Sequence, residues 1–417
     1  MLKNTQYSTY LVGGAVRDKL LGLPVSEQDW VVVGATPAML LSEGFKQVGK
    51  DFPVFLHPIT HEEYALARTE RKTAKGYYGF VCDFSESVTL EEDLLRRDIT
   101  INAIAEDIKG NFLDPYGGQE DLKNKLLRHV SPAFREDPVR ILRLARFASR
   151  FFPLGFRIAP ETQRLMCEMV ESGEVDHLVP ERVWKELFRS LTESDPTQFI
   201  EVLRSCGALR VLWPELNALW GIPQPVQHHP EIDTGVHVMM VLKTACALSS
   251  DPLTRFAALC HDLGKGKTDP KQWPSHRGHE ELGVPLIKQF CNRYKLPTEY
   301  KALAILVSRY HLHCHRAFEL KPSTLLTTLE RLDAFRKPER FEKFLLACEA
   351  DAKGRMDFEH IAYPQAQKMR EAYKAAKNAD IQSVVGKGFE GEVLKNKIHQ
   401  IRVAAITQSG TVQELKV

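Results

Sequence analysis

The stretch Leu11–Gly34, LVGGAVRDKLLGLPVSEQDWVVVG, decides how the first part of this chain folds. A short apolar run meets two glycines, a helical pattern follows, and a second apolar run begins at Trp30. Two acids, Glu27 and Asp29, stand at the entrance of that second run. The pattern predicts a strand, a glycine turn, a helix and a second strand.

The two acids predict a metal site. Side chains two apart on a strand point to the same face, so Glu27 and Asp29 are expected to converge. Like charges at that distance repel unless a cation lies between them. Such a pair suits Mg²⁺, which also holds substrate phosphates, and two ions can bind the attacking and leaving oxygens of a phosphoryl displacement. Gly13 and Gly14 would leave backbone amides and a helix N-terminus open to a triphosphate. The alternative is a polar loop with solvated acids, which the glycine pair, Arg17 and the following apolar run disfavour.

Composition indicates a soluble globular protein of two or three domains: the chain has 417 residues, 43% hydrophobic and 26% charged. No apolar stretch reaches the roughly 20 residues that span a bilayer, and the first residues carry no secretion signal. The eight cysteines are scattered without a C-x-x-C pair, which suits a reducing cytoplasm and argues against disulfides or a thiolate zinc site. With a net charge of +2, a nucleic-acid partner would need a local basic patch.

The pattern changes from mixed α/β to helical near Asp137. Before it, short strand patterns (YLVGG, WVVVG, EEYALA, NFLDP) are separated by glycine and proline turns. After it, apolar residues recur at spacings of three and four in DPVRILRLARFASR, ERVWKELFRSL and PTQFIEVLRSCGALRVL. Pro138 and Pro196 stand where first helical turns would begin. We therefore predict an α+β fold, with a mixed-sheet head followed by an all-helical body.

The segment EDPVRILRLARFASR carries a stripe of arginines opposite its apolar residues. On a helix the four arginines share one face: Arg140, Arg143, Arg146 and Arg150. Such stripes are usually solvated surfaces, but this one lacks interspersed acids. Arginines without acidic partners indicate a surface that binds phosphates.

Histidines gather in the second half of the chain, where nine of the 15 fall between residues 228 and 315. HDLGKGK begins at His261, HRGHEELG begins at His276, and YHLHCH contains His311. Most lone histidines are ordinary core or surface residues. An adjacent imidazole and carboxylate followed by a turn and lysines instead suits a metal ion with a bound phosphate, and such sites accept nickel, manganese and other transition ions.

GGAVRD, the E-x-D before an apolar strand, and RRDITINA at 96–103 together resemble the class II tRNA nucleotidyltransferases. The resemblance implies a polymerase-β-like head in which Glu27 and Asp29 are catalytic and bind Mg²⁺. Many relatives carry D-x-D here, and Glu27 keeps the charge on a longer arm. The nucleotide-binding residues that the resemblance implies are Gly14, Arg17, Arg97, Asp98, Asp137, Arg140, Arg143 and Arg146.

EDPVR matches the E-D-x-x-R motif of that family, which implies that Asp137 and Arg140 read the Watson–Crick edge of the incoming nucleotide. A carboxylate accepts from the exocyclic amine that C and A possess and U lacks, while arginine donates to the same edge. A wrong base leaves buried polar groups unpaired, at roughly 1–3 kcal/mol each. PERVWKELF at 180–188 is interpreted as a scaffold helix.

HDLGKGK is similar to the signature of HD-domain phosphohydrolases. The similarity implies His261 and Asp262 as catalytic residues and His237, His261, Asp262 and His279 as metal ligands, with Asp351 as a candidate distal ligand. It also implies a transition ion, Ni²⁺ above all, that activates water. The activity would be phosphatase and 2′,3′-cyclic phosphodiesterase, as in multifunctional bacterial enzymes.

Together the motifs imply four parts: a nucleotidyltransferase head (1–138), a helical neck and body for nucleotide selection and RNA binding (139–227), an HD domain (228–329) and a helical tail (330–417). The implied function is template-independent addition and repair of the 3′-terminal CCA of tRNA from CTP and ATP. The tail would bind the tRNA elbow by shape and phosphate contacts. We expect a cytoplasmic monomer or homodimer without a membrane partner.

Other functions stay open. A poly(A) polymerase shares this head, but a strongly basic extension is expected there, and QIRVAAITQSGTVQELKV at the C-terminus is mild. Enzymes that add only CC or only A differ in a flexible loop, which here falls in ARTERKTAKGYYGF at 67–80. An HD phosphohydrolase whose head only binds nucleotide would not need the paired acids. A nonenzymatic RNA chaperone would explain the arginines but neither metal site.

Overall fold

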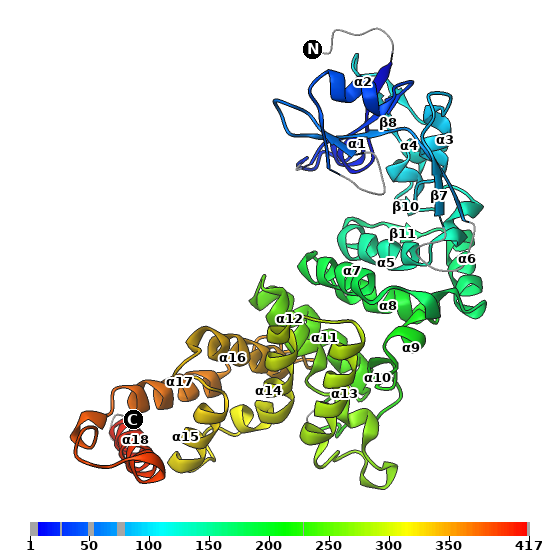
Figure 1. The fold of residues 1–417 in the computed structure, drawn as a ribbon. Coiled ribbons are helices and arrows are strands. Elements are labelled where there is room, and N and C mark those ends of the chain that lie inside the picture. Colours follow the sequence, from blue (N-terminus) through cyan, green and yellow to red (C-terminus); the bar gives the residue numbers. More distant parts are fainter. Residues whose placement is uncertain (1–6, 26, 49–53, 73–79, 228, 415–417) are drawn as a thin grey trace. The chain divides into compact units, whose positions relative to one another are not determined.

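The residues that the computed structural model describes are 7–25, 27–48, 54–72, 80–227 and 229–414 (Figure 1). The chain divides into two units, Met1–Leu212 and Trp213–Val417. The centre of the loop expected to distinguish single-addition enzymes, residues 73–79, lies outside the described residues.

A seven-stranded mixed sheet forms the head of the first unit, in the order β3-β4-β5-β2-β1-β8-β9. Strand β2 pairs parallel with β5 and antiparallel with β1, and the other neighbouring pairs are antiparallel. The strands are β1 (Ser8–Val12), β2 (Asp29–Val33), β3 (Lys46–Gln47), β4 (Val54–Leu56), β5 (Glu63–Leu66), β8 (Ala105–Asp107) and β9 (Phe112–Leu113). The predicted mixed-sheet head is confirmed.

The turn after β1 fixes where the neighbouring elements start. Gly13 has a φ of 69°, a left-handed conformation that glycine adopts without strain, and helix α1 (Gly14–Leu20) follows at once. Since β1 pairs with β2 only up to Val12, opposite Asp29, the residues before Asp29 have no ladder partner there. Asp29 therefore begins the strand and Glu27 precedes it, so the two acids stand at its entrance, and the alternation of side chains along a strand does not apply to Glu27.

Short elements complete the head. They are α2 (Pro37–Ser42), the antiparallel pair β6 (Thr69–Lys72) and β7 (Phe80–Asp83), α3 (Leu90–Leu95), α4 (Gly118–Lys123), and the parallel pair β10 (Leu126–Leu127) and β11 (Arg157–Ile158). Helix α3 begins with a capping box, in which the side chains of Thr89 and Glu92 satisfy each other's backbone N–H groups.

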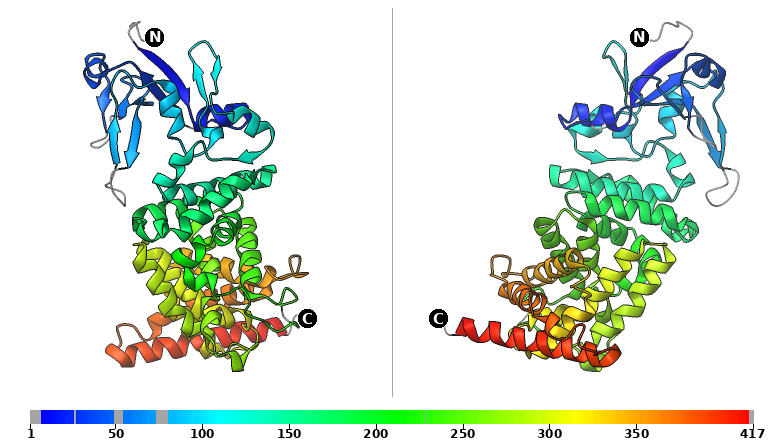
Figure 2. Two further views of the ribbon diagram at one scale, coloured as in Figure 1. Left: turned by 90° about the vertical axis from the view of Figure 1, so that its right-hand side faces the viewer. Right: turned by 60° about the vertical axis from the view of Figure 1, so that its left-hand side comes forward.

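The rest of the first unit is helical, as predicted. The helices are α5 (Val139–Phe151), α6 (Pro160–Glu171), α7 (Pro180–Thr192), α8 (Thr197–Ser205) and α9 (Ala208–Leu212). Helix α5 packs against α7 and α8, which Figure 2 shows from two further sides. The apolar run at 196–212 forms two helices because Gly207 turns the chain with a φ of 82°.

The described part of the second unit is a helical array. Its α-helices are α10 (Pro214–Asn217), α11 (Thr234–Leu248), α12 (Pro252–Cys260), α13 (His279–Arg293), α14 (Thr298–His315), α15 (Pro322–Arg331), α16 (Pro338–Lys353), α17 (Pro364–Lys377) and α18 (Gly391–Glu414). Helices α11, α12, α14 and α16 pack together, and α18 packs on α15 and α17. No helix in the described ranges is long and apolar enough to cross a membrane. The four-part division at residues 138, 227 and 329 stays a prediction.

A buried carboxylate holds the RRD segment against the sheet. Asp93 of α3 accepts hydrogen bonds from Nη2 of Arg96 at 2.6 Å and from Nη2 of Arg97 at 3.1 Å. It also accepts from the backbone N–H of Arg68 at 3.3 Å. Burial alone would raise the pKa of Asp93, but the guanidinium groups of Arg97 and Arg96 bring it below its ordinary value.

Replacing Asp93 with alanine should destabilise the first unit by on the order of 3 kcal/mol at pH 7, because two largely buried arginines lose a carboxylate partner and Arg96 keeps only its ion pair with Glu70. As the folded pKa is the lower one, the pair stabilises fully above the unfolded pKa of 3.8, and its contribution disappears as the pH falls below that value. Hydrogen exchange of peptides from residues 1–212 at pH 7 and pH 3 measures the difference. Glu91→Ala, on the exposed side of the same helix, is the control, and equal losses in both variants would contradict the assignment.

Candidate active sites

A pocket of about 960 Å³ lies in the first unit. Its wall contains both glycines of the strand-to-helix turn, Asp29, the RRD segment and residues of α5 and α7. Ten arginines line it, Arg17, Arg68, Arg96, Arg97, Arg140, Arg143, Arg146, Arg150, Arg182 and Arg189, beside four acids, Asp29, Glu70, Asp98 and Asp137. This excess of positive charge suits a triphosphate and RNA phosphates. Of the predicted head residues, Glu27 alone is missing from the described wall.

The Arg17 side chain is buried at the base of the pocket. Its Nη1 donates to Oδ1 of Asn102 at 2.6 Å and its Nε donates to Oδ1 of Asp18 at 2.9 Å. The guanidinium carbon lies 4.9 Å from the ring centre of Phe151. Burial lowers the pKa of Arg17 below its ordinary value, although the Asp18 carboxylate acts to raise it. Because the side chain of Asn102 accepts this hydrogen bond from Arg17, it links helix α1 to the segment RRDITINA.

Asp98 of the RRD segment connects that segment to α5. Nε of Arg143 donates to its Oδ2 at 2.8 Å, and Nδ2 of Asn102 donates to its Oδ1 at 3.0 Å. Burial works to raise the pKa of Asp98, but Arg143, Asn102 and then Arg140 hold it far below the ordinary value. Asp98 is therefore an anion at neutral pH.

The expectation that the α5 arginines lack acidic partners is wrong. Nε of Arg146 donates to Oε2 of Glu186 on α7 at 2.7 Å, and Nη2 of Arg150 donates to Oδ2 of Asp18 at 2.9 Å. Arg140 instead donates to two backbone carbonyls, of Ala133 at 3.1 Å and of Arg96 at 2.6 Å. The acids stand on other elements, so the sequence of one helix could not reveal them.

Asp137, just before α5, is held by a residue that the sequence did not single out. Nη1 and Nη2 of Arg182 on α7 donate to its two carboxylate oxygens at 3.1 and 2.6 Å. Helix α7 packs on α5 as a scaffold should, yet it also supplies Arg182 and Arg189 to the pocket wall. The sequence signal that could have identified Arg182 was its place in PERVWKELF, one position before Val183, which is buried.

The two acids of the opening stretch are close enough to interact. Desolvation raises the pKa of Asp29, the Arg97 guanidinium lowers it and the Glu27 carboxylate raises it, so that it lies above its ordinary value. A divalent cation between the carboxylates would remove their repulsion. The donors are all oxygens, which fits Mg²⁺.

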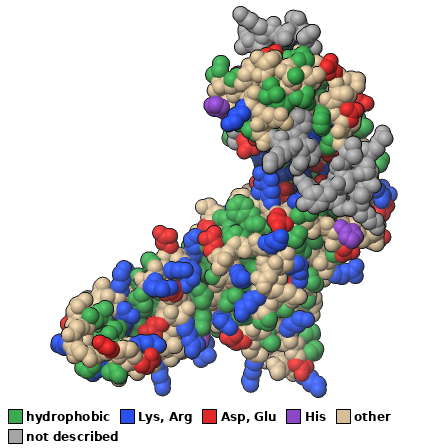
Figure 3. Space-filling view, in the orientation of Figure 1, with side chains coloured by type: hydrophobic (Ala, Val, Ile, Leu, Met, Phe, Trp, Pro, Cys, Tyr) green, Lys and Arg blue, Asp and Glu red, His purple; other side chains and the backbone are tan. Residues whose placement is uncertain are grey.

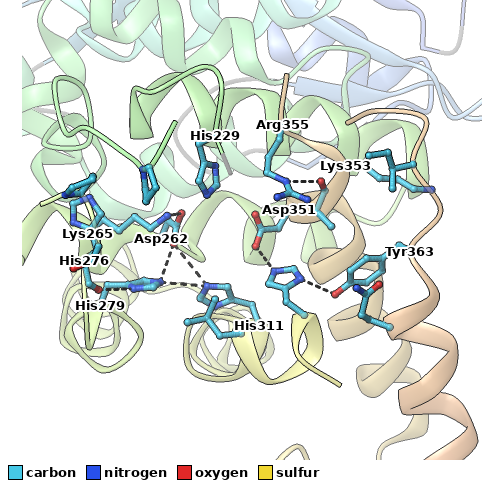
Figure 4. A pocket seen from close by; sticks show the side chains of 18 of the residues that line it. His229, Asp262, Lys265, His276, His279, His311, Asp351, Lys353, Arg355 and Tyr363 are labelled. Carbon is cyan, nitrogen blue, oxygen red and sulfur yellow. Dashed lines mark hydrogen bonds and ion pairs between the residues drawn. The ribbon is translucent and has the colours of Figure 1, made fainter. Parts of the chain in front are cut away.

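The second unit contains a pocket of about 530 Å³, shown in Figure 4, beside a cluster of histidines and acids, of which Asp262, His279, His311 and Asp351 line the pocket. The cluster is assembled from five helices and one short 3-10 helix, η5 (Leu263–Lys267). Its six central residues are His237 on α11, His261 and Asp262 between α12 and η5, His279 on α13, His311 on α14 and Asp351 on α16. All six are buried.

One group of possible ligands consists of His237, His261 and Asp351. Oδ1 of Asp351 lies 3.1 Å from Nε2 of His237 and 3.5 Å from Nε2 of His261. Nε2 of His261 is also 3.1 Å from Oδ2 of Asp262. Burial lowers the pKa of His261, but Asp262 and Asp351 raise it to about 10. The carboxylates thus attract a positive charge to the place that a metal ion would occupy, and the imidazole and carboxylate donors fit a transition ion.

The second group consists of Asp262, His279 and His311. Nε2 of His279 lies 3.2 Å from Oδ1 of Asp262 and 3.4 Å from Nε2 of His311. The predicted set of four ligands is therefore brought together, with His279 on the other side of Asp262 from His237. His311 was singled out in YHLHCH. His315, which the sequence did not single out, lines the same pocket, and its Nε2 lies 2.7 Å from Oδ2 of Asp351.

The turn HDLG is shaped by the close approach of α13. A Cβ on Gly264 would lie 1.9 Å from the carbonyl oxygen of His279, so only glycine fits. The turn also brings Nζ of Lys265 to 2.6 Å from Oδ2 of Asp262. Burial would raise the pKa of Asp262, but His261 and Lys265 hold it well below the ordinary value. On the other side of His237, Oε1 of Glu231 lies 2.9 Å from its Nδ1.

Comparison with protein families gives three matches along the chain. The Poly A polymerase head domain matches residues 9–128, the probable RNA and SrmB-binding site of polymerase A matches 155–219, and the HD domain matches 234–339.

Relatives match nearly the whole chain. The Multifunctional CCA protein of Teredinibacter turnerae is 60% identical over 404 residues, covering 97% of this chain and 98% of the relative. That of Legionella pneumophila (strain Paris) is 59% identical over 397 residues, covering 95% and 96%. Among solved structures, an apo CCA-adding enzyme covers 98% of this chain and 92% of its own, with a TM-score of 0.67 at 20% identity. The Bacillus stearothermophilus CCA-adding enzyme in complex with CTP covers 100% and 96%, with a TM-score of 0.64 at 21% identity. These two structures share the fold, and the sequence relatives show that the chain belongs to the multifunctional CCA protein family.

Proposed function

We propose that the first unit adds and repairs the 3′-terminal CCA of tRNA from CTP and ATP without a nucleic-acid template. The observation that carries the proposal is one pocket of about 960 Å³ that joins Asp29, the glycine turn, the arginines and the pair Asp137 and Arg140. The names of the sequence relatives support the same reaction. Free thiols on all eight cysteines accord with action on tRNA in the cytoplasm.

In this reaction the terminal 3′-hydroxyl of tRNA attacks the α-phosphorus of the nucleotide and pyrophosphate leaves. Glu27 and Asp29 would hold Mg²⁺, which lowers the pKa of the hydroxyl and neutralises developing negative charge. The amides at Gly13 and Gly14 face the triphosphate at a helix N-terminus. The remaining predicted residues bind triphosphate and ribose either directly or through their ion pairs: Arg17, Arg97, Asp98, Arg143 and Arg146.

Asp137 and Arg140 select the base in this proposal. Asp137 accepts from the exocyclic amine of C or A, and both of its oxygens are oriented by Arg182. Arg140 has two N–H groups fixed on the carbonyls of Ala133 and Arg96. A guanidinium has five N–H groups, so the fixed side chain keeps donors for a ring nitrogen or carbonyl. U has no exocyclic amine and presents its O4 carbonyl oxygen at that place, so the Asp137 carboxylate would face a second acceptor instead of a donor.

For the second unit we propose phosphatase and 2′,3′-cyclic phosphodiesterase activity at the histidine cluster. His237, His261, Asp262 and Asp351, with His279 beyond Asp262, would hold a transition ion such as Ni²⁺, which activates water and polarises the phosphoester. Lys265, Lys353 and Arg355 line the same pocket and supply positive charge for the phosphate. Figure 4 shows the last two at the side of the pocket opposite His279.

The helical tail is proposed to bind the tRNA elbow through shape and phosphates. On the face shown in Figure 3, Lys and Arg side chains are spread over the second unit among acidic ones and are not gathered in one patch.

The first test incubates the full chain and Mg²⁺ with tRNA transcripts ending before CCA, after C and after CC. CTP, ATP, UTP and GTP are given singly and in pairs, and the products are sized. CTP and ATP together should complete CCA, after which growth stops. Unlimited or single addition of A would instead identify a poly(A) polymerase or an A-only enzyme, and addition that stops at CC a CC-only enzyme. If the protein hydrolyses phosphoesters but adds no nucleotide to tRNA, the head only binds nucleotide and the proposal fails.

The two activities should be separable by single substitutions. Asp29→Ala should lower CCA addition on the order of a hundred- to a thousandfold and leave phosphoester hydrolysis unchanged, while His261→Ala should do the reverse. Gln28→Ala and His360→Ala, at exposed positions, are the matched controls. The assays are nucleotide incorporation into tRNA and release of phosphate from a 2′,3′-cyclic nucleotide. Loss of both activities in either variant would contradict two separate sites.

Arg182→Ala should lower the preference for CTP and ATP over UTP by about tenfold, because Asp137 loses two hydrogen bonds that orient it. The preference is read from kcat/KM for each nucleotide on a tRNA ending before CCA. Arg182→Lys should restore part of it, since one ammonium group can still reach a carboxylate oxygen. Lys185→Ala, exposed on the same helix, is the control. An unchanged preference in Arg182→Ala would show that Asp137 is oriented by other groups.

A further inference from the structure

We propose that His315 and Tyr363 are positioning residues of the hydrolytic site, in which Tyr363 donates a hydrogen bond to His315 and His315 donates one to Asp351. The two side chains stand outside the candidate ligand groups. They act by fixing the direction in which Asp351 offers its carboxylate to a metal ion. The inference rests on the proposed hydrolase for its use, but its first readout, metal affinity, needs no substrate.

The two oxygens of Asp351 have different partners. Oδ1 lies 3.1 Å from Nε2 of His237 and 3.5 Å from Nε2 of His261, so it faces the ligand group. Oδ2 lies 2.7 Å from Nε2 of His315 on α14. Burial would raise the pKa of Asp351, but His261 and His315 hold it well below its ordinary value, so the group is a carboxylate that can only accept. One oxygen is thus engaged by His315, and the other is left for the ion.

The direction of the hydrogen bonds follows from this carboxylate. Because Oδ2 of Asp351 can only accept, Nε2 of His315 carries the hydrogen, and in the neutral imidazole Nδ1 holds the lone pair. The hydroxyl oxygen of Tyr363 lies 2.8 Å from that Nδ1. Burial raises the pKa of Tyr363, so its hydroxyl keeps the hydrogen that it donates. Sγ of Cys314, 3.4 Å from the same hydroxyl, is a weaker acceptor than the ring nitrogen.

Three separate segments supply the chain of hydrogen bonds. Asp351 belongs to α16, His315 is the last residue of α14, and Tyr363 directly precedes α17. The rings of His315 and Tyr363 meet edge to face, with their centres 5.7 Å apart, and both line the pocket. Figure 4 shows the dashed lines that lead from Asp351 toward Tyr363. Packing of these segments therefore fixes the carboxylate before any ion is bound.

The competing explanation is that His315 and Tyr363 only fill space beside the ligands. Tyr363→Phe separates the two explanations, because it keeps the ring and changes no atom that touches Asp351. Without the hydroxyl, the imidazole of His315 can carry its hydrogen on Nδ1 instead. The lone pair of Nε2 then faces the Asp351 oxygen, and the carboxylate loses the donor that orients it. A residue that only fills space would leave metal affinity unchanged when this hydroxyl is removed.

The test titrates Co²⁺ into metal-free full-length protein with Asp29→Ala as the parent, so that the head acids do not contribute. Visible absorption gives the affinity, and the d–d bands report the arrangement of the ligands. His315→Ala should weaken Co²⁺ binding roughly 10- to 100-fold, and Tyr363→Phe should weaken it by about fivefold. His315→Gln should recover part of the loss, because its amide N–H can still donate to Asp351.

A second pair of rings on α14 provides matched controls. Tyr310 and His313 lie with their ring centres 5.6 Å apart, and neither is in the wall of the pocket. Tyr310→Phe and His313→Ala should bind Co²⁺ as the parent does. A circular dichroism melt of the metal-free protein shows whether each variant is folded, and His315→Gln replaces His315→Ala if the latter is not.

An affinity in Tyr363→Phe equal to that of the parent would overturn the inference, whatever His315→Ala does. If the parent also hydrolyses a 2′,3′-cyclic nucleotide in that case, the proposed function stands without the positioning residues. Weaker Co²⁺ binding in both variants of a chain that hydrolyses no phosphoester would keep the positioning residues and reject the hydrolase.

Discussion

The ion pair between Asp98 and Arg143 is the interaction on which the nucleotide pocket depends. A carboxylate buried this deeply must have partners, and Asp98 finds them on α5 and in Asn102. Asn102 in turn accepts from Arg17 of α1. One charge therefore links the strand-to-helix turn, the RRD segment and the arginine helix, which are far apart in sequence. The walls of the pocket keep their spacing because this anion is costly to separate from its partners.

The candidate sites of the two units differ in the charge of the residues that form them. In the head, arginines outnumber acids in the pocket wall, whereas the histidine cluster brings together carboxylates and imidazoles that could hold a metal ion. The two sites also differ in their donor atoms. Glu27 and Asp29 offer only oxygens, which favour Mg²⁺, and the cluster offers nitrogen and oxygen, which favour transition ions. A single chain can thus use two metals without exchanging them between sites.

The sequence predicted the mixed-sheet head and the helical body, because these depend on local periodicity and on compact motifs. Most of the residues proposed for the head site line its pocket, but Glu27 does not line the described wall. Partners across the fold could not be predicted. Nothing in EDPVRILRLARFASR indicates that Glu186 and Asp18 neutralise its arginines, or that Arg182 orients Asp137. The position of Glu27 outside the strand depended on where β1 turns away at Gly13. His311 and His315 could be told from His313 only after α14 was packed and its inner face known.

The backbone contacts of the histidines have a consequence for folding. His261, His279 and His311 each place Nδ1 against a carbonyl oxygen three or four residues earlier in the chain. The imidazoles are therefore ordered by their own segments, and the entropy of arranging the ligands is lost when the unit folds and not when metal arrives. Folding without metal must then hold the carboxylates of Asp262 and Asp351 together, with Lys265 and a protonated His261 as their counter-ions. For this unit, metal affinity and the free energy of unfolding are two measures of the same preorganisation.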